Sequence, residues 1–553
     1  MQRFKRTLCI TAALSIAACS TFSLFGCSTE NDVVTLRVAN WEEYIDLGDW
    51  GEDELIDIEN EYAEDPEDGV FGENSMVDDF VEWFNANHDY EVEVEYSTFG
   101  TNEDLYNRLS LGDIYDLVCP SDYMIMKLLA EDEVEPFSDE FFDEDNEHNY
   151  YVNNASDYIT GIFDDYGWSQ YAACYMWGTT GIVYNPDLVD EEAVSTWDIL
   201  RDADYKRQVT IKDNVRDAYF ATLGIIHGEE LELLDIGYGD ATADERSALL
   251  NDTSDETIAA AEDMLKEIKE NVYSFETDSG KADMVTGKVL ANYQWSGDAV
   301  YIMDEADGDE SNPTELWYSV PEECTNLWFD GWVMLKDGID GDEQRKEAAE
   351  AFVNFLSRPD NAVRNMYYIG YTSSIASDLV FDYMDWNYGF VFDPSDEEYF
   401  DEELTEVYEY DLSYFFGDGY SLYVDASVLE LDGDTLEVSS EMLGEEEYGN
   451  DIEYTVYRGG EINRGRQLFG QYPTANIIDR SVVMLDFGDK LTDINQMWIH
   501  VRCLDLLDYN PVIVGIVAAV VVVIILAIVL YHFRYRIFIK KYKPRKGYKK
   551  IEA

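Results

Sequence analysis

Apolar and polar positions follow two different periods over the first 120 residues. Residues 33–39 and 91–97 alternate apolar and polar side chains, as strands with one buried face do. Residues 76–87 instead place apolar side chains on one helical face, and residues 102–111 also predict a helix. A third strand is expected over 115–118. The order strand, helix, strand, helix, strand predicts an α/β unit with a parallel sheet.

Further strands are expected over 175–184, 209–211 and 289–295, and further helices over 255–271 and 344–356. Several of the strands end in aromatic or hydroxyl side chains. Trp41 and Tyr44 follow the first strand, and Ser121 and Tyr123 follow the third. Ligands of open α/β sheets bind beyond the carboxyl ends of the strands, so these side chains are candidates for a binding site.

Two segments depart from this pattern. Residues 48–75 are acidic and contain glycine, which predicts a surface insertion. Residues 385–470 are rich in Tyr, Asp and Glu and contain short alternating runs, which predict a β-rich insertion. Arg458, Arg464 and Arg466 form a basic patch there, which we expect to pair with neighbouring acids.

The charge of the chain limits its partners. There are 118 acidic against 36 basic residues, a formal net charge of −82. Such a surface repels nucleic acid and anionic membranes and attracts cations, although solubility alone would also explain it. Cys119, Cys174, Cys324 and Cys503 are too sparse for a disulfide scaffold, with one or two bridges left open. No metal, cofactor or catalytic motif stands out, so neither an enzyme nor a cofactor is predicted.

Both ends of the chain carry topological signals. Residues 1–26 resemble a lipoprotein-type signal peptide, with a basic start and an apolar run over 8–18. Cys27 is the predicted lipidation site; Cys19 and an unmodified cysteine are the alternatives. Residues 512–531 are apolar and uncharged, which predicts a transmembrane helix, and the basic tail at 532–553 marks the cytoplasmic side. The remainder would then face outward from a bacterial cell.

Two stretches combine aromatic rings with a carboxylate, at 292–298 and at 327–332. Ring faces attract ammonium groups, and carboxylates form charge-assisted hydrogen bonds with them. These stretches therefore suit an organic cation, whereas the plainer alternative is a buried aromatic core with one satisfied acid.

Eight motifs, in order and at matching spacing, resemble the spermidine/putrescine-binding proteins of bacterial polyamine ABC importers. They lie at 40–44 (NWEEY), 96–103 (YSTFGTNE), 115–123 (YDLVCPSDY), 177–181 (WGTTG), 213–217 (DNVRD), 295–298 (WSGD), 327–330 (LWFD) and 369–372 (IGYT). The resemblance covers roughly 33–384 and 471–503.

This resemblance implies a two-lobed α/β fold of the periplasmic-binding-protein type (type II), with hinge-crossing strands and the ligand between the lobes. Lobe 1 would comprise 33–176 and 329–384, and lobe 2 would comprise 177–328. A closing segment would follow the insertion, at 471–508.

The resemblance also implies the residues that hold the ligand. Aromatic rings would hold its methylene chain, and carboxylates and hydroxyls its amines. Carried onto this sequence, the set is Trp41, Glu43, Tyr44, Ser121, Tyr123, Asn214, Asp217, Trp295, Trp328, Asp330 and Tyr371.

Two positions depart from the pattern of these proteins. Asn214 stands where a second acid is frequent, and Glu42 stands where Thr is frequent. Together they would move one negative charge between the lobes and change the spacing of the anionic ends. The alternative is that Glu42 points to solvent and Asn214 caps a helix.

The predicted function is the solute-binding component of an ABC importer, which captures putrescine or spermidine and delivers it to a permease and its ATPase. One alternative keeps the fold but changes the solute to an amino acid, a sugar or Fe³⁺. A second is a surface adhesion or sensor protein that uses the Tyr-rich insertion.

Overall fold

The computed structural model describes residues 33–503, apart from 49–55, 66, 71, 73, 236–239, 310–312, 391–405, 430–433 and 440–452, and also 519–528 and 531. The chain divides into two units, residues 1–495 and 496–553, and the fold below is that of the first. The predicted signal peptide, Cys27 and the basic tail lie outside the described residues. Within the described part, no helix is long and apolar enough to cross a membrane. The predicted span at 512–531 is described only over 519–528 and at Tyr531.

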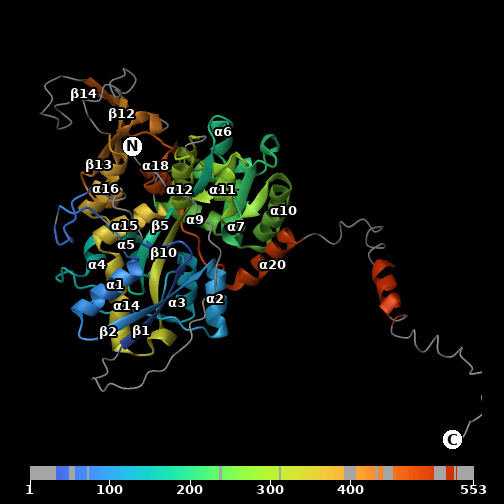
Figure 1. The fold of residues 1–553 in the computed structure, drawn as a ribbon. Helices are drawn as coiled ribbons and strands as arrows, with labels where there is room; N and C mark the ends of the chain where they lie inside the picture. Colours follow the sequence, from blue (N-terminus) through green and yellow to red (C-terminus); the bar gives the residue numbers. More distant parts are fainter. Residues whose placement is uncertain are drawn as a thin grey trace, which may run out of the picture. The chain divides into compact units, whose positions relative to one another are not determined.

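Three parallel strands form one end of the main sheet. β1 (Val33–Trp41) pairs with β2 (Glu91–Phe99) on one side and with β3 (Leu117–Val118) on the other. Helices α1 (Met76–Asn87) and α2 (Asn102–Leu111) connect them. Each begins after a residue whose side chain accepts a backbone N–H, Ser75 and Thr101. The predicted alternation of strand and helix is therefore confirmed (Figure 1).

Two long buried strands cross the middle of the sheet. β5 (Ala172–Tyr184) and β10 (Thr325–Leu335) run antiparallel, and both are buried along their whole length. The first part of β5 pairs with β10, whereas its last residues pair with β8 (Ala291–Trp295). β5 thus belongs to both halves of the sheet, as hinge-crossing strands would.

The described strands of the main sheet are ordered β2-β1-β3-β10-β5-β8-β6-β7. Its remaining strands are β4 (Val134–Glu135), β6 (Val209–Lys212), β7 (Ser274–Glu276), β9 (Trp317–Ser319), β11 (Thr372–Ser373), β16 (Arg464–Gly465) and β17 (Ser481–Val482). The helices of the first 200 residues are short after α2: α3 (Asp122–Ala130), α4 (Tyr150–Asn154), α5 (Asp157–Asp165) and α6 (Glu191–Val194).

The helices that follow α6, apart from one in the acidic segment at 385–470, complete the list for the described residues. They are α7 (Val215–Ile226), α8 (Gly228–Asp235), α9 (Asp240–Leu250), α10 (Asp255–Asn271), α11 (Ser279–Val285), α12 (Ser296–Asp307), α13 (Lys336–Ile339), α14 (Glu343–Leu356), α15 (Pro359–Ile369), α16 (Asp378–Tyr388), α18 (Gln467–Gln471), α19 (Ala475–Arg480) and α20 (Leu491–Arg502). α1 and α14 meet through the rings of Phe80 and Phe352, whose centroids are 4.9 Å apart.

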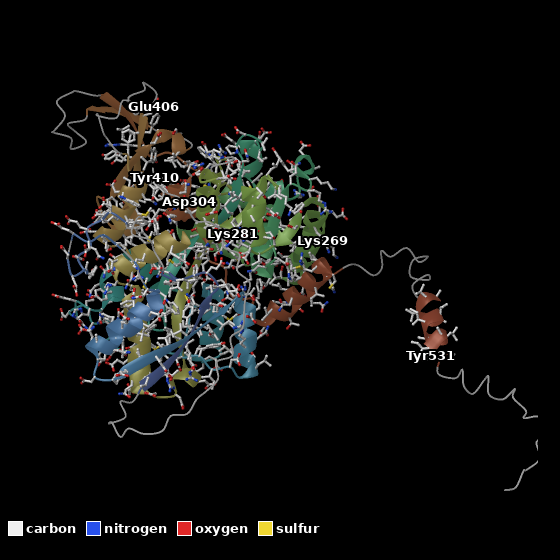
Figure 2. All side chains as sticks on the ribbon, in the orientation of Figure 1. Lys269, Lys281, Asp304, Glu406, Tyr410 and Tyr531 are labelled. Carbon is white, nitrogen blue, oxygen red and sulfur yellow. The ribbon has the colours of Figure 1, made fainter. Side chains whose placement is uncertain are left out.

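A second sheet accounts for the late acidic segment, whose predicted β-rich character is confirmed. Its described strands, in the order β13-β12-β15-β14, are β12 (Glu406–Asp411), β13 (Ser421–Asp425), β14 (Asp434–Ser439) and β15 (Glu453–Arg458). The segment packs on the frame through α17 (Ser413–Phe416), where Phe415 stacks on Trp177 of β5 at 5.4 Å. Tyr410, labelled in Figure 2, donates to the carbonyl of Tyr472.

The basic patch of this segment pairs with acids, as expected. Arg458 contacts Glu409, and Arg466 contacts Asp307. Arg464 lies 3.0 Å from Glu191.

Two details differ from the sequence-based expectation. The segment at 48–75 does not lie wholly on the surface, because Ile56 and Val70 pair with each other and are buried in the core. Cys119, Cys174, Cys324 and Cys503 are free thiols, so neither of the bridges left open is present among them.

Candidate functional site

Asp330 is the centre of a buried hydrogen-bonded cluster in the middle of β10. The register of the β5–β10 ladder shifts directly after Asp330, and such a bulge re-aims a side chain. Its carboxylate accepts hydrogen bonds from Ser121 Oγ at 2.7 Å and Tyr44 Oη at 2.8 Å. Burial raises the pKa of Asp330 to about 6, although the hydroxyls of Ser121 and Tyr44 act to lower it. β10, the start of α3 and the loop after β1 therefore converge on one carboxylate.

Aromatic rings surround this cluster. The ring of Tyr371 lies edge-on to Tyr44 and Trp328, with centroid distances of 4.9 and 5.7 Å. Trp328 is fixed by its indole N–H, which donates to the carbonyl of Thr179 at 2.9 Å. A Cβ at Gly297 would lie 2.3 Å from the Tyr371 ring, so only glycine allows this close approach.

Asp217 is a second buried carboxylate, in the first turn of α7. It is 2% exposed, and its Oδ2 has no hydrogen-bond partner among the described residues. Burial raises its pKa to about 6, while Lys212 and a hydrogen bond from Trp295 act to lower it. Because buried polar atoms are normally satisfied, this oxygen is available to a donor from a ligand.

Lys212 brings a positive charge to the same place. It ends β6, is fully buried, and donates to the carbonyl of Thr277 at 3.0 Å. Its Nζ lies 3.9 Å from the centroid of the Trp295 ring. The same atom is 3.9 Å from a carboxylate oxygen of Glu276 and 3.9 Å from one of Asp298.

Asp298, in the first turn of α12, connects this charge to the aromatic rings. One of its oxygens accepts a hydrogen bond from Tyr371 Oη at 3.1 Å and lies 3.4 Å from Lys281 Nζ. Lys281, labelled in Figure 2, comes from α11. Asp298 raises the pKa of Lys281 against the effect of burial, which lowers it.

The remaining predicted residues lie around these groups. Trp41 packs on Phe99, with ring centroids 4.9 Å apart. Glu43 is exposed and adopts a φ of 54°, a left-handed backbone that is strained for a non-glycine residue. Tyr123 is buried, and its hydroxyl accepts from Asn102 Nδ2 at 2.9 Å.

Asn214 follows the alternative that the sequence left open. It is the N-cap of α7, and its side-chain oxygen accepts the backbone N–H of Arg216 at 2.8 Å. Glu42 is exposed. Asn214 is an uncharged amide and Glu42 is exposed, so neither residue contributes a buried charge to the cluster.

Sequence reasoning missed four polar residues here: Asn102, Lys212, Arg216 and Lys281. Arg216 covers the ring of Tyr123 at 3.6 Å and donates to the carbonyl of Leu485 at 2.7 Å and to Asp486 at 3.0 Å. Lys212 directly precedes the motif at 213–217 and Arg216 lies within it, so their place beside a strand end was a usable signal. Lys281 carries no comparable signal.

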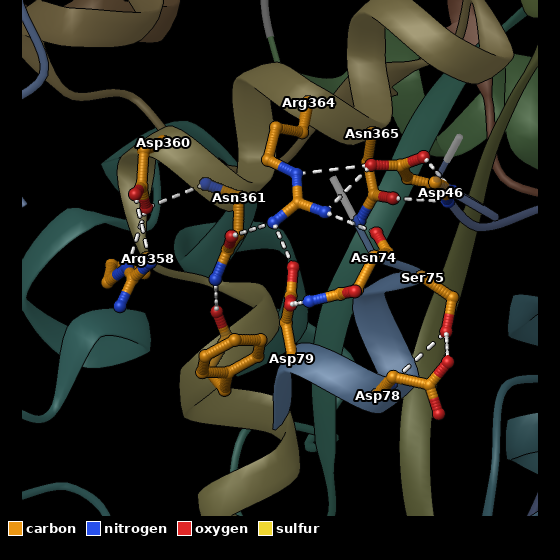
Figure 3. A network of polar contacts seen from close by, with 12 residues as sticks. Asp46, Asn74, Ser75, Asp78, Asp79, Arg358, Asp360, Asn361, Arg364 and Asn365 are labelled. Atoms are coloured by element: carbon orange, nitrogen blue, oxygen red, sulfur yellow. Dashed lines mark hydrogen bonds and ion pairs between the residues drawn. The ribbon is translucent and has the colours of Figure 1, made fainter. Parts of the chain in front are cut away.

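An arginine network holds the loop of Tyr44 in place (Figure 3). Nε and Nη2 of Arg364 donate to one carboxylate oxygen of Asp46 at 3.1 and 3.0 Å, and Nη1 donates to Asp79 at 3.0 Å. The backbone N–H of Asp46 donates to Asn365 at 2.9 Å. Arg364 and Asn365 lie on α15, which ends directly before the turn to Tyr371. The network thus fixes the loop that carries Tyr44 relative to the helix that leads to Tyr371.

Two α/β halves that share long crossing strands, with acids and aromatic rings gathered at the crossing, define a binding protein for a small solute. Residues 79–378, more than half of the chain, match the profile of the bacterial extracellular solute-binding proteins, and the chain belongs to this family. The resemblance inferred from the motifs is thereby confirmed at the level of the family. Members bind solutes for transport, so the chain is a binding protein and not an enzyme.

Named relatives are similar over much of their own length. A spermidine/putrescine-binding periplasmic protein of Salmonella typhimurium is 27% identical over 282 residues, or 51% of this chain and 70% of the relative. A putrescine-binding periplasmic protein of Pseudomonas aeruginosa is 25% identical over 373 residues, or 65% of this chain and 82% of the relative.

A solved structure extends the likeness of fold. It is of a protein from Listeria monocytogenes assigned to spermidine/putrescine ABC transport, with a TM-score of 0.51 and 20% identity. The matched region covers 85% of this chain and 98% of the Listeria protein. At this identity the likeness shows a shared fold, which spans most of the chain.

Proposed function

We propose that the chain captures a linear polyamine, putrescine or spermidine, and delivers it to the permease and ATPase of an ABC importer. The observation that carries the proposal is a pair of buried carboxylates, Asp217 and Asp330. No basic side chain in the described part of the chain forms an ion pair with either of them. A polyamine supplies ammonium groups for both carboxylates. The named relatives, which bind polyamines, support the same reading.

Each end of the ligand has a proposed set of partners. One ammonium binds Asp330, whose carboxylate is oriented by Ser121 and Tyr44. The methylene chain packs on Trp328 and Tyr371.

A second ammonium reaches the free oxygen of Asp217 near Trp295. Trp41, Glu43, Tyr123 and Asn214 are proposed as further contacts of the ligand. The lobe boundaries given above, 177–328 for the second lobe, are part of this proposal.

Calorimetric titration of the purified full chain with putrescine and with spermidine tests the proposal. We expect saturable binding of at least one amine with one ligand per chain. A folded protein that binds no amine would refute the amine ligand and leave another solute as the cargo.

The affinity for either amine should fall in mild acid. Aliphatic ammonium groups stay charged, whereas carboxyls with a pKa of about 6 gain a proton between pH 7 and 5. A protonated carboxyl must release its proton when an ammonium binds, so affinity should drop roughly tenfold per pH unit below 6 for each such carboxyl. Titrations from pH 8 to 5 measure this slope, and Asp330→Asn should reduce it. A flat profile across this range would contradict the assignment of these two carboxyls.

Attachment to the membrane is a separate part of the proposal. A lipid on Cys27 and a helix over 512–531 would hold the protein beside its permease and raise its local concentration there. Mass spectrometry of the mature N-terminal peptide tests the lipid. Deletion of 511–553 from a Cys27→Ala strain should lower amine uptake, and unchanged uptake would contradict the role of the helix.

A further inference from the structure

The buried charges of the candidate site do not cancel. The carboxylates are Asp217, Glu276, Asp298 and Asp330, which are all less than a tenth exposed. The ammonium groups beside them are Lys212, which is fully buried, and Lys281, whose side chain is 22% exposed. Four carboxylates against two ammonium groups leave two negative charges.

Neighbouring charged groups do not change this balance. Arg216 is matched by Asp486 at 3.0 Å. Asp122 is buried, which raises its pKa to about 8, so this carboxyl carries little charge at pH 7. Asp278 lies 3.8 Å from Lys281 Nζ but is exposed, as are Glu43 and Glu103, and water and salt screen the charge of exposed groups.

Lys212 occupies the position that a ligand ammonium would favour. An ammonium within about 6 Å of the centroid of a tryptophan ring is attracted by its face, and Lys212 Nζ lies at 3.9 Å. Carboxylate oxygens of Glu276 and Asp298 each lie 3.9 Å from Lys212 Nζ, which also donates a hydrogen bond to the carbonyl of Thr277 at 3.0 Å. These partners hold the ammonium in place without a ligand.

We propose that Lys212 is a specificity-determining residue. Its own ammonium group occupies the face of the Trp295 ring, so the site selects amines with two positive charges over amines with three. The inference rests on the proposed function and names the ligand class within it. A dication balances the two remaining negative charges, whereas a third ammonium would meet Lys212 without a free carboxylate to receive it. Loss of Lys212 leaves three negative charges and an open ring face, which suit a trication.

The test is the ratio of the dissociation constants of putrescine and spermidine, measured by calorimetry on the full chain. The wild-type protein should bind putrescine at least as tightly as spermidine. Lys212→Gln should shift the ratio at least tenfold toward spermidine. Lys288→Gln is the matched control, because Lys288 also has an acid partner, Asp283 at 2.8 Å, and a ring, Tyr273 at 4.8 Å, but is half exposed. The control should leave the ratio within threefold.

Loss of Lys212 leaves Glu276 buried beside an empty position, so Lys212→Gln alone could fail to fold. The double variant Lys212→Gln/Glu276→Gln removes both charges, and an amide oxygen remains to accept the N–H of Gly280 that Glu276 now accepts at 2.7 Å. Since this variant keeps two negative charges but frees the ring of Trp295, it should still improve spermidine binding relative to putrescine.

The two proposals fail in different ways. A ratio that changes less than threefold in a folded Lys212 variant, or a wild-type protein that binds spermidine more tightly than putrescine, would overturn the role of Lys212 while amine binding stands. Absence of any amine binding in every variant would overturn the proposed function itself.

Discussion

Asp330→Ala is expected to weaken putrescine binding by about 30-fold to several thousand-fold, because truncation of one partner of a buried charge pair typically costs about 2–5 kcal/mol. Asp330 is 7% exposed, and among the described residues its carboxylate has only the hydroxyls of Ser121 and Tyr44 as hydrogen-bond partners. A ligand ammonium is therefore the cation that it lacks. Titration calorimetry at pH 7 measures the loss.

Glu350 provides the matched control. It is half-buried on α14 and also accepts from a serine, through the N–H and the hydroxyl of Ser138, both at 2.7 Å. Glu350→Ala should leave the affinity within threefold. An equally small change in a folded Asp330→Ala protein would remove Asp330 from the site.

The carboxylate of Asp330, although expected to strengthen ligand binding, should destabilise the folded protein when no ligand is present. A carboxyl with a folded pKa of about 6 and an ordinary unfolded pKa near 4 binds protons more readily when folded. It therefore opposes folding above pH 6, less so between 6 and 4, and not below. Asp330→Asn should melt at the same or a higher temperature at pH 7 without ligand. A lower melting temperature would indicate a structural role for the carboxylate.

Local signals made much of the fold predictable. α10 was expected over 255–271 and spans those residues, because Ser254 caps its start and its apolar positions repeat with the helical period. β3 is shorter than the expected 115–118, since only Leu117 and Val118 pair with β1. Asp330 and Trp328 could be chosen as candidate site residues because a carboxylate and aromatic rings lie within one strand.

The charges beside these residues could not be chosen in the same way. In the sequence Lys212 is a lysine at the end of a strand, and only the structure shows its hydrogen bond to Thr277, 65 positions away. Asn214 lies within the motif at 213–217, and only the structure shows that its side-chain oxygen accepts the backbone N–H of Arg216. A sequence shows which groups are neighbours along the chain, whereas the net charge of a buried site depends on groups from distant parts of the chain that folding brings together.

The pair of Arg364 and Asp46 is the clearest case, because 318 positions separate them. Their side chains are 5% and 0% exposed. Arg364 also binds Asp79 at 3.0 Å and the carbonyl of Asn74 at 3.3 Å. Figure 3 shows these groups converging on one guanidinium. Removal of the guanidinium would leave the carboxylate of Asp46 buried without its cation.

Arg364→Met should therefore lower the free energy of unfolding by about 3–5 kcal/mol, the usual cost of breaking a buried ion pair from one side. Urea denaturation of the ligand-free protein measures it. Arg201→Met is the control, because Arg201 and Asp198 form a partly exposed pair at the surface, worth about 1 kcal/mol or less. Arg364→Met/Asp46→Asn should recover part of the loss, since the unpaired charge is then absent. If Arg364→Met cost no more than Arg201→Met, the network would not hold the loop of Tyr44 against α15.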